Sequence, residues 1–512
     1  MKVAAALDAL KQRKAPLAMP PGEFREIGHR LVDQIADRLA ALPDAPVTRH
    51  ESPADLRRLI GAAQALPAAG TDAGGLIRDA ADLLFDHSLF NGHPRFFGYI
   101  TSSPAPIGML GDFLAAALNQ NVGAHQLAPL ATEIEAQTVR WIAELIGFPA
   151  SGGLLVSGGN MANFVCLAAA RAAKAPGNIR KEGLSRSAAS LLVYTSTDTH
   201  GWIRKAADLL GLGTDAIRWI DTDAEHRLDA SALRGRIDED LRLGYHPFAV
   251  VATAGSIGTG AVDPLPEIGA ICREYGLWFH VDGAYGALAA QAAGSPASLR
   301  ALSDADSVAV DPHKWLYAPL EAGCVLVRDP EMLRHAFSYH ATYYHFDDDG
   351  VVNYYDYGPQ NSRGFRALKV WLALRQVGRA GYLQMIADDI ALAQHLHRLM
   401  AQHPEFEATS QSLSITTFRY VPPDLRAHIG SAQAEACLNR LNQRLLTAVE
   451  QSGEAFLSNA LVDGRFVLRA CIVNFHTSLD DIQALPALLS RLGREADQEP
   501  RSEIGRLTGE CS

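Results

Sequence analysis

Strand-like apolar stretches alternate with helical patterns along residues 153–329, and this order most constrains the fold. The strand-like runs are short, apolar and bounded by glycine, proline or charged residues, and they lie at 154–156, 191–194, 248–253, 277–281, 305–310 and 324–329. Strands that alternate with helices build a mostly parallel sheet covered by helices. We therefore predict an α/β fold for this region.

A single lysine, Lys314, lies in the turn DPHK between the last two of these runs. Trp315 and Leu316 follow it directly, so the amine is predicted to have apolar surroundings. Burial disfavours the ammonium form, and a neutral amine can attack a carbonyl group. The alternative is a lysine whose stem is packed while its head reaches water.

An aspartate, Asp282, comes at the end of the run 277–281 and is followed by the small residues Gly283, Ala284 and Gly286. Ligands of open α/β sheets bind outside the carboxyl ends of the strands, which is where this carboxylate is predicted to lie. A carboxylate with a buried lysine nearby is the arrangement that pyridoxal phosphate enzymes need. Taken alone, Asp282 could equally be a helix cap or a turn residue.

The stretches DPHKW (311–315) and HVDGAY (280–285) resemble the group II pyridoxal-phosphate decarboxylases. That family includes the aromatic L-amino-acid, tyrosine, tryptophan and glutamate decarboxylases, all of fold type I. The resemblance covers about residues 23–490. It implies pyridoxal 5'-phosphate as cofactor, a fold type I PLP-dependent transferase-like architecture, and decarboxylation of an L-amino acid.

The resemblance also implies roles for individual residues. Lys314 would carry the cofactor, Asp282 would contact its ring nitrogen, and His200 and Ala284 would lie on the two ring faces. Gly159 and Asn160 match the phosphate-binding turn, where a helix N-terminus with small residues also suits an anion. Further cofactor contacts are expected from Thr253, His313 and Asp311, although the family often has asparagine at the last of these positions. No metal site is expected.

A long segment without periodicity, residues 338–365, is predicted to be a functional lid. Its stretch VVNYYDYGPQNSRGF resembles the family's catalytic loop and places Tyr354 as the proton donor to the substrate α-carbon, reaching the partner's site. A slip of one residue would assign this role to Tyr355. Upstream, the resemblance makes pocket-lining candidates of Phe96, Phe97, Tyr99, Ile100 and Ser102, for which plain core packing is the alternative.

Four segments are predicted along the chain. Residues 1–103 form a helical segment that, by resemblance, packs on a dimer partner, or else on its own chain. Residues 104–377 form the large cofactor-binding domain, 378–495 a small C-terminal α+β domain, and 496–512 a disordered tail. The resemblance implies a homodimer with an active site shared across the interface.

Composition excludes several classes of protein. The formal net charge of −11 and the lack of a Lys/Arg stripe argue against nucleic-acid binding. No apolar run is long enough for a membrane span or a signal peptide. The six cysteines have no CxxC or metal-ligand spacing, which is typical of thiols in a reducing cytoplasm.

The predicted reaction is conversion of an aromatic L-amino acid (tryptophan, tyrosine, phenylalanine or DOPA) to the amine and CO2. Three alternatives stay open: an aldehyde synthase of the same family, a decarboxylase of a non-aromatic amino acid such as valine or glutamate, and a non-catalytic binding protein. Tyrosine rather than phenylalanine at 354 argues against the synthase.

Overall fold

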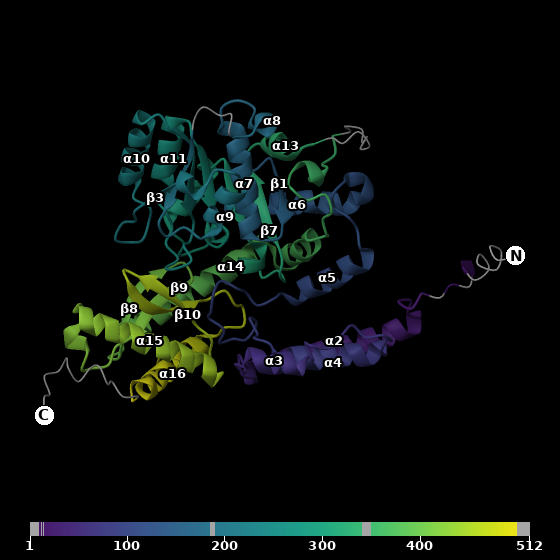
Figure 1. The fold of residues 1–512 in the computed structure, drawn as a ribbon. Helices are drawn as coiled ribbons and strands as arrows, with labels where there is room; N and C mark the ends of the chain where they lie inside the picture. The colour runs from purple at the N-terminus through teal and green to yellow at the C-terminus, as the bar shows by residue number, and fades with distance from the viewer. Residues whose placement is uncertain (1–9, 12, 14, 185–189, 340–349, 499–512) are drawn as a thin grey trace. The chain divides into compact units, whose positions relative to one another are not determined.

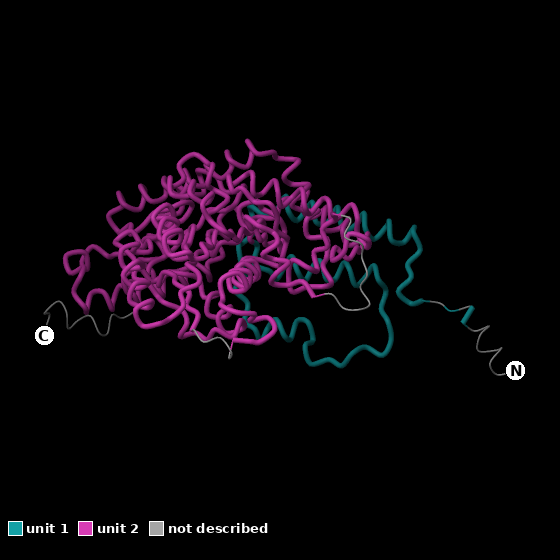
Figure 2. Tube along the Cα trace, turned by 90° about the horizontal axis from the view of Figure 1, so that it is seen from above, with its two compact units in different colours: residues 1–90 teal, residues 91–512 magenta. Residues whose placement is uncertain are grey.

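The computed structural model describes residues 10, 11, 13, 15–184, 190–339 and 350–498, in two compact units, 1–90 and 91–512 (Figure 2). The first unit contains helices α2 (Pro21–Ala41), α3 (Pro53–Leu59) and α4 (Ala73–His87). Helices α2 and α4 lie side by side, because Gln34 donates to Asp82 at 2.7 Å and Arg38 to Asp86 at 3.1 Å. The predicted helical character of this segment is therefore present in α2, α3 and α4.

A seven-stranded sheet forms the centre of the second unit (Figure 1). Its order is β1-β7-β6-β5-β4-β2-β3. The strands are β1 (Gly152–Val156), β2 (Leu191–Ser196), β3 (Ile217–Ile220), β4 (His246–Thr253), β5 (Trp278–Asp282), β6 (Ser307–Val310) and β7 (Gly323–Val327). Only β7 runs against its neighbours, so the predicted mostly parallel sheet is confirmed.

Helices and short turns connect and cover these strands. They are α5 (Pro106–Leu118), α6 (Pro129–Ile146), α7 (Gly159–Lys174), α8 (Ile179–Glu182), α9 (Trp202–Leu209), α10 (Ala230–Arg242), α11 (Leu265–Tyr275), α12 (Pro312–Trp315) and α13 (Glu331–Phe337). The alanine-rich helix α7 buries Val165, Cys166 and Ala169 completely. Small side chains let this helix pack closely, which explains its composition.

Short 3-10 helices occur at η1 (Leu42–Asp44), η2 (His125–Leu127), η4 (Thr214–Ala216), η5 (Gly286–Ala289), η6 (Ala297–Asp304), η7 (Tyr354–Asp356) and η8 (Arg426–His428). Their tight geometry suits short connections between longer elements.

A second, antiparallel sheet follows in the C-terminal part, with the order β10-β11-β9-β8. Its strands are β8 (Phe406–Ser412), β9 (Ile415–Tyr420), β10 (Ser458–Val462) and β11 (Arg465–Cys471). Helices α14 (Ala367–Gln402), α15 (Ala432–Ser452) and α16 (Leu479–Asp497) accompany it. The predicted small α+β region is thus present.

The long helix α14 joins the regions of the two sheets. It is interrupted at Gly378, whose φ of 68° is accessible mainly to glycine. The interruption coincides with the predicted boundary at 377, although both sheets belong to one compact unit. Helix α16 continues to Asp497, and the rest of the predicted tail from 499 lies outside the described residues.

None of the helices in the described ranges has both the length and the apolar character needed to cross a bilayer.

Candidate active site

The carboxyl ends of six strands lie at one edge of the large sheet, because β1 to β6 all run in the same direction. The residues that follow these ends surround a cavity of about 290 Å³. Ten of the predicted residues line it: Tyr99, Ile100, Gly159, Asn160, His200, Thr253, Asp282, Ala284, Asp311 and Lys314. Parallel strands therefore bring together residues that lie far apart in the sequence.

Lys314 lies on the one-turn helix α12 and reaches into this cavity. Its Nζ atom is 3.1 Å from Oδ2 of Asp311, and His313 Nε2 is 3.6 Å from the same oxygen. Burial lowers the pKa of His313, and the Asp311 charge only partly offsets this effect. Its Nδ1 accepts a hydrogen bond from the backbone of Ala322 at 3.2 Å, so His313 supports the lysine turn from outside the cavity lining.

Asp311 stands at a position where the family often has asparagine. Its side chain is buried, and within the described ranges its Oδ1 atom has no hydrogen-bond partner. A buried oxygen of this kind is uncommon and marks a position where a ligand or a proton is held. The Lys314 ammonium balances the charge of the other oxygen.

Asp282 ends strand β5 and is held by two donors. Oδ2 accepts from the indole nitrogen of Trp202 at 2.6 Å, and Oδ1 accepts from the backbone of Ala284 at 3.2 Å. Donors to a carboxylate favour its ionised form. Sequence reasoning missed Trp202, although its place two residues after His200 at the start of a helix was a usable signal.

Behind Asp282, the buried imidazole of His280 joins the sheet to helix α7. Its Nε2 lies 2.7 Å from Oδ1 of Asn163, and its Nδ1 lies 2.9 Å from Oγ of Ser307. Burial lowers the pKa of His280 to about 4, while the nearby Asp282 charge acts in the opposite direction. A neutral imidazole therefore supports the strand that presents the carboxylate.

Gly159 opens helix α7 at the cavity, as the sequence predicted. A Cβ atom on this residue would lie 2.7 Å from Asp311 Oδ2 and 2.9 Å from the Ala284 Cβ atom. Only glycine fits, so the backbone N–H groups at the start of the helix stay accessible to an anion. Asn160 lines the cavity beside it.

His200 is exposed within the chain and lines the same cavity. Its Nδ1 accepts from the backbone N–H of Trp202 at 3.2 Å, which orients the ring. Thr253 is tied to its surroundings by its backbone N–H, which donates to Asp263 at 2.7 Å. Its hydroxyl lies 3.4 Å from that of Thr199.

Phe96, Phe97 and Ser102, predicted to line the pocket, do not line this cavity. Phe96 stacks on Phe456 with ring centroids 5.2 Å apart, and Phe97 is buried in the core around the second sheet. The apolar-core alternative therefore holds for both rings. Ser102 donates to the carbonyl oxygen of His313 at 2.8 Å, so it supports the lysine turn instead.

Tyr354 also differs from expectation. It lies in η7, is 1% exposed, and is absent from the cavity lining. The Arg363 guanidinium lies 4.6 Å from its ring centroid, and burial raises the pKa of its hydroxyl well above the usual value. Within this chain the side chain is packed against Arg363, and its role as proton donor in a partner's site stays a prediction. Tyr355 is half-buried, and residues 340–349 of the predicted lid lie outside the described residues.

Six further residues line the cavity without having been singled out as site residues: Thr101, Asn163, Trp202, Gly255, Ile257 and Tyr285. Trp202 and Tyr285 add aromatic surface, and Ile257 adds an apolar side chain that is 45% exposed. Tyr285 belongs to the HVDGAY stretch, and Gly255 and Ile257 follow the end of β4. Their closeness in sequence to predicted site residues was the signal that could have identified them.

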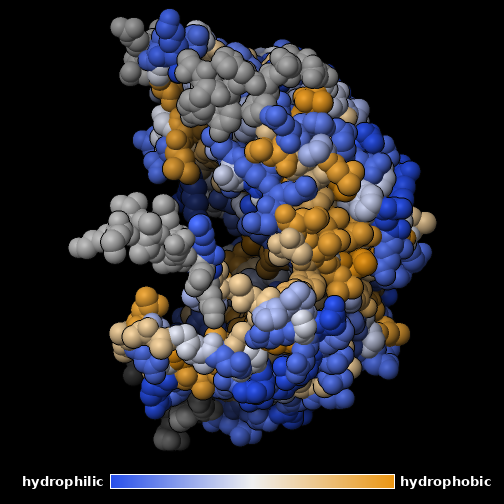
Figure 3. All heavy atoms as spheres, turned by 90° about the vertical axis from the view of Figure 1, so that its right-hand side faces the viewer, coloured by the Kyte–Doolittle hydropathy of each residue, from blue (hydrophilic) through white to orange (hydrophobic). Residues whose placement is uncertain are grey.

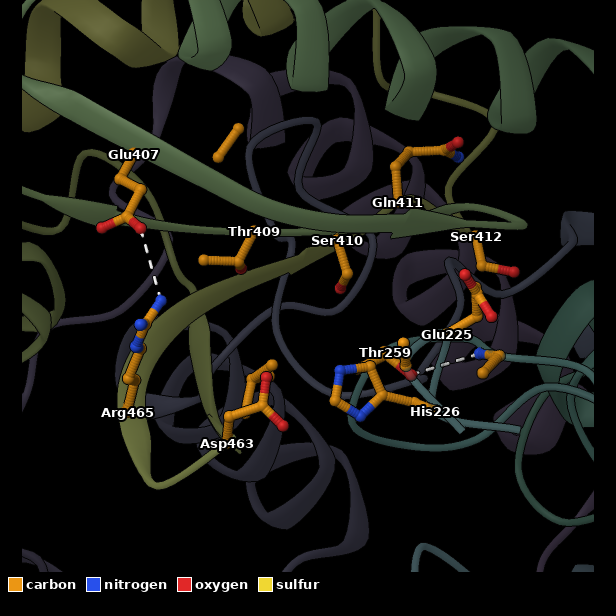
Figure 4. Close-up of a pocket in the computed structure, with 14 residues that line it drawn as sticks. Glu225, His226, Thr259, Glu407, Thr409, Ser410, Gln411, Ser412, Asp463 and Arg465 are labelled. Atoms are coloured by element: carbon orange, nitrogen blue, oxygen red, sulfur yellow. Dashed lines mark hydrogen bonds and ion pairs between the residues drawn. The ribbon is translucent and has the colours of Figure 1, made fainter. Parts of the chain in front are cut away.

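A second cavity, of about 400 Å³, lies between strand β8, the β10–β11 turn and residues 224–226 (Figure 4). Its lining is polar and includes Glu225, His226, Glu407, Asp463 and Arg465. None of the predicted site residues lines it. This cavity is larger than the first, but the chemistry of the lining and not the volume decides the site.

The residues of the first cavity fit pyridoxal 5'-phosphate. Lys314 offers an amine for its aldehyde, Asp282 a carboxylate for its ring nitrogen, and the start of α7 backbone donors for its phosphate. Two features are structural signs of a ligand-binding site: the clearance that only Gly159 allows, and the buried Asp311 oxygen, which has no partner among the described residues. Fold and site together define a pyridoxal phosphate enzyme of fold type I.

Comparison with known proteins specifies the family. Residues 53–421 match the conserved domain of pyridoxal-dependent decarboxylases. The chain is 32% identical to an aromatic-L-amino-acid decarboxylase of Bacillus atrophaeus over 484 residues, 94% of this chain and 97% of the relative. It is 30% identical to a phenylacetaldehyde synthase of a Rosa hybrid cultivar over 470 residues, 89% of this chain and 91% of the relative.

A solved structure of Oryza sativa TDC with PLP and tryptamine has a TM-score of 0.86 to this chain. The two are 26% identical, over 94% of this chain and 99% of that structure. The chain belongs to the family of pyridoxal-dependent decarboxylases. It is a carboxy-lyase that uses pyridoxal 5'-phosphate.

Proposed function

We propose that this enzyme decarboxylates an aromatic L-amino acid to the corresponding amine. The observation that carries the proposal is the meeting of Lys314, Asp282 and His200 on one cavity that aromatic and apolar side chains also line. Tyr99, Ile100, Trp202, Ile257 and Tyr285 supply that apolar surface. The similarity to an aromatic-L-amino-acid decarboxylase supports the same substrate class.

The bound cofactor would supply a conjugated ring that accepts the electrons released with CO2. Lys314 would hold it covalently through its amine, and Gly159 and Asn160 would contact its phosphate at the start of α7. Asp282, held in place by Trp202 and the Ala284 N–H, would contact the ring nitrogen and favour its protonated form. Electrostatic support of this kind acts where charge develops in the reaction.

Two further residues would place the flat ring. His200, oriented by the Trp202 N–H, would lie on one face, and the small side chain of Ala284 would allow close approach on the other. Thr253, at the end of β4, and Asp311, directly after β6, would complete the binding site for the cofactor. His313 would act indirectly, through its support of the lysine turn.

The alternative product is an aldehyde, since phenylacetaldehyde synthases are among the similar proteins. The sequence argument against this alternative depended on Tyr354 as a lid residue. Because Tyr354 is buried against Arg363, its identity no longer separates the two products. Direct product analysis is therefore needed.

Product analysis on the cofactor-loaded enzyme tests the proposal. Tryptophan, tyrosine, phenylalanine, DOPA, valine and glutamate are supplied separately, and amine, aldehyde and CO2 are measured together. We expect amine and CO2 in equal amounts from an aromatic substrate, and no turnover by Lys314→Ala, which lacks the attachment amine. Aldehyde as the main product would support the synthase, and turnover of valine or glutamate alone would refute the aromatic assignment.

We also propose that the enzyme is a homodimer with the site completed at the interface. Support comes from helix α5, where Leu110, Phe113, Leu114 and Leu118 are each between 51% and 56% exposed. Figure 3 views the molecule from the side of Figure 1 where α5 lies, and it shows hydrophobic side chains gathered on that face. Apolar patches of this kind mark association surfaces.

Sedimentation analysis tests this assembly. The double variant Phe113→Asp/Leu114→Asp is expected to sediment as a monomer, because two charges would be buried in the interface. Leu209→Asp, at a leucine on α9 that is 74% exposed, serves as the control and should leave the dimer intact. A dimer that survives the double variant would exclude α5 from the interface.

A cytoplasmic location is proposed on the basis of the thiols. Five cysteines in the described part are buried free thiols, which suits a reducing compartment.

A further inference from the structure

A buried carboxylate on helix α14, Asp389, contacts the turn that carries Lys314. It is 3% exposed, and its Oδ2 atom accepts from the indole nitrogen of Trp315 and from the hydroxyl of Tyr317, both at 2.8 Å. These two donors lie one and three residues after Lys314. A single buried oxygen therefore holds both sides of the segment that follows the lysine.

Other contacts to the same turn come from the same helix and from the cavity wall. Tyr382, also on α14, donates to the carbonyl oxygen of Leu316 at 3.1 Å. The ring of Trp315 stacks on Tyr285 with centroids 4.9 Å apart, and Tyr285 lines the cavity. The three residues after Lys314 are thus each held by a side chain of α14.

The backbone at Tyr317 requires such support. Its φ is 54°, in the left-handed region that bulky residues rarely adopt. Conformations of this kind persist only where the surroundings hold them, and they are concentrated at functional sites. The hydrogen bond that the Tyr317 hydroxyl donates to Asp389 is a direct means of holding it.

Asp389 lies in the part of α14 beyond the interruption at Gly378. There, the Ala393 carbonyl accepts from Thr416 of β9 at 2.8 Å, which ties this part of the helix to the second sheet. The Asp389 hydrogen bonds therefore connect the lysine turn of the first sheet to a helix that is anchored on the second. Neither the sequence motifs nor the family resemblance pointed to this residue.

We propose that Asp389 is a positioning residue for Lys314, acting through Trp315 and Tyr317. It does not line the cavity, so its effect on the reaction is indirect. The inference rests on the role of Lys314 in the proposed function. A misplacement of about 1 Å at a reacting group can lower a rate about 10²-fold, which sets the size of the expected effect.

The chemistry of Asp389 allows its charge and its hydrogen bonds to be tested separately. Burial raises its pKa to about 7, the Trp315 and Tyr317 hydrogen bonds lower it, and Asp388 raises it. Tyr317 and Cys471 are the other titratable groups that interact with it. Because both donors use one oxygen, asparagine can accept both hydrogen bonds without charge, whereas leucine can accept neither.

The first measurement is the rate at which Lys314 captures the cofactor. Full-length chain depleted of cofactor is mixed with pyridoxal 5'-phosphate, the absorbance change is followed, and borohydride trapping with mass analysis locates the label on Lys314. Asp389→Leu is expected to slow capture and to lower kcat by about 10²-fold, with KM changed less than about threefold. Asp389→Asn is expected to restore both rates to within about fivefold of the parent enzyme.

A matched control is Asp240→Asn on α10. Asp240 is also buried and accepts from a tyrosine, Tyr194, at 2.9 Å, but it lines neither the cavity nor the lysine turn. This variant should capture cofactor at the parent rate even if its thermal stability falls. Trp315→Phe removes one hydrogen-bond donor to Asp389 and keeps the stacked ring. Combining it with Asp389→Leu should slow cofactor capture no further than Asp389→Leu alone, because both changes break the same contact.

Stability against pH provides a readout that does not require Asp389→Leu to fold. Because the pKa of Asp389 is raised from about 3.8 to about 7, the folded parent loses stability as pH rises through that window. The unfolding temperature of Asp389→Asn should therefore rise relative to the parent between those pH values.

The outcomes separate this inference from the proposed function. Capture in Asp389→Leu at the parent rate, or equal slowing in Asp240→Asn, would overturn the positioning role while leaving the decarboxylase assignment untouched. If Asp389→Leu does not fold, a parent-like capture rate in Trp315→Phe would overturn it instead. No capture at Lys314 in the parent itself would overturn both.

Discussion

Replacing Asp282 with asparagine is expected to lower kcat for decarboxylation by about 10²- to 10³-fold. The substitution keeps the shape of the side chain and removes its charge. In the native enzyme, Trp202 and the Ala284 N–H stabilise the carboxylate, at 2.6 and 3.2 Å. Without that charge, the cofactor ring nitrogen would lose its proton, and the ring would accept electrons less readily.

Steady-state kinetics with a saturating aromatic substrate measure this effect, after absorbance has verified equal cofactor loading. The matched control is Asp306→Asn. Asp306 accepts a backbone hydrogen bond from Phe279 at 2.8 Å and lies just before β6, near the opposite edge of the sheet. It should retain kcat within about threefold, since it is remote from the developing charge. A fully loaded Asp282→Asn enzyme with parent-like kcat would contradict the assigned role.

Replacing Arg363 with methionine is expected to reduce the free energy of unfolding by about 3–5 kcal/mol. Arg363 is 3% exposed and forms an ion pair with Glu135, which is 0% exposed. Its guanidinium also donates to the carbonyl oxygens of Val122 and Leu155, both at 2.7 Å. Its removal leaves a buried carboxylate and two carbonyl groups without their partner.

Denaturant unfolding of the two enzymes measures this loss. The double variant Arg363→Met/Glu135→Met should recover part of the stability, because an apolar pair replaces the charged one without leaving a charge unpaired. Arg234→Met disrupts an ion pair with Glu274 at 2.7 Å whose members are both solvent-exposed, and it should change stability little. If the double variant were less stable than Arg363→Met, the unpaired carboxylate would not be the cause.

Arg363 and its contacts also explain why the position of Tyr354 differs from expectation. The motif around residues 351–366 identified this segment correctly as part of the family pattern, but burial is a property of the whole fold. Glu135 on α6 and the backbone of β1 hold Arg363, and Arg363 covers the Tyr354 ring at 4.6 Å. These partners are more than 200 residues upstream of Arg363. A local motif contains no information about such partners.

The aromatic residues 96 and 97 show the same limit. Their sequence context resembled a pocket wall, and the alternative of core packing was open. The contact of Phe96 with Phe456, 360 residues later in the chain, decides between them. A contact between residues so far apart in the sequence depends on how the region of the second sheet packs against this earlier part of the chain.

The sequence by itself determined the fold class and the principal site residues. Alternating strands and helices have only one common solution, a parallel sheet, and in such a sheet the carboxyl ends of the strands meet at one edge. Gly159, His200, Asp282 and Lys314 follow such ends, so their convergence on one cavity was predictable from order alone. Only the tertiary structure decided which side chains support them: Trp202 on Asp282, and Asp389 on the lysine turn. Supporting contacts of this kind depend on side-chain direction and distance between elements, and neither is encoded in local sequence patterns.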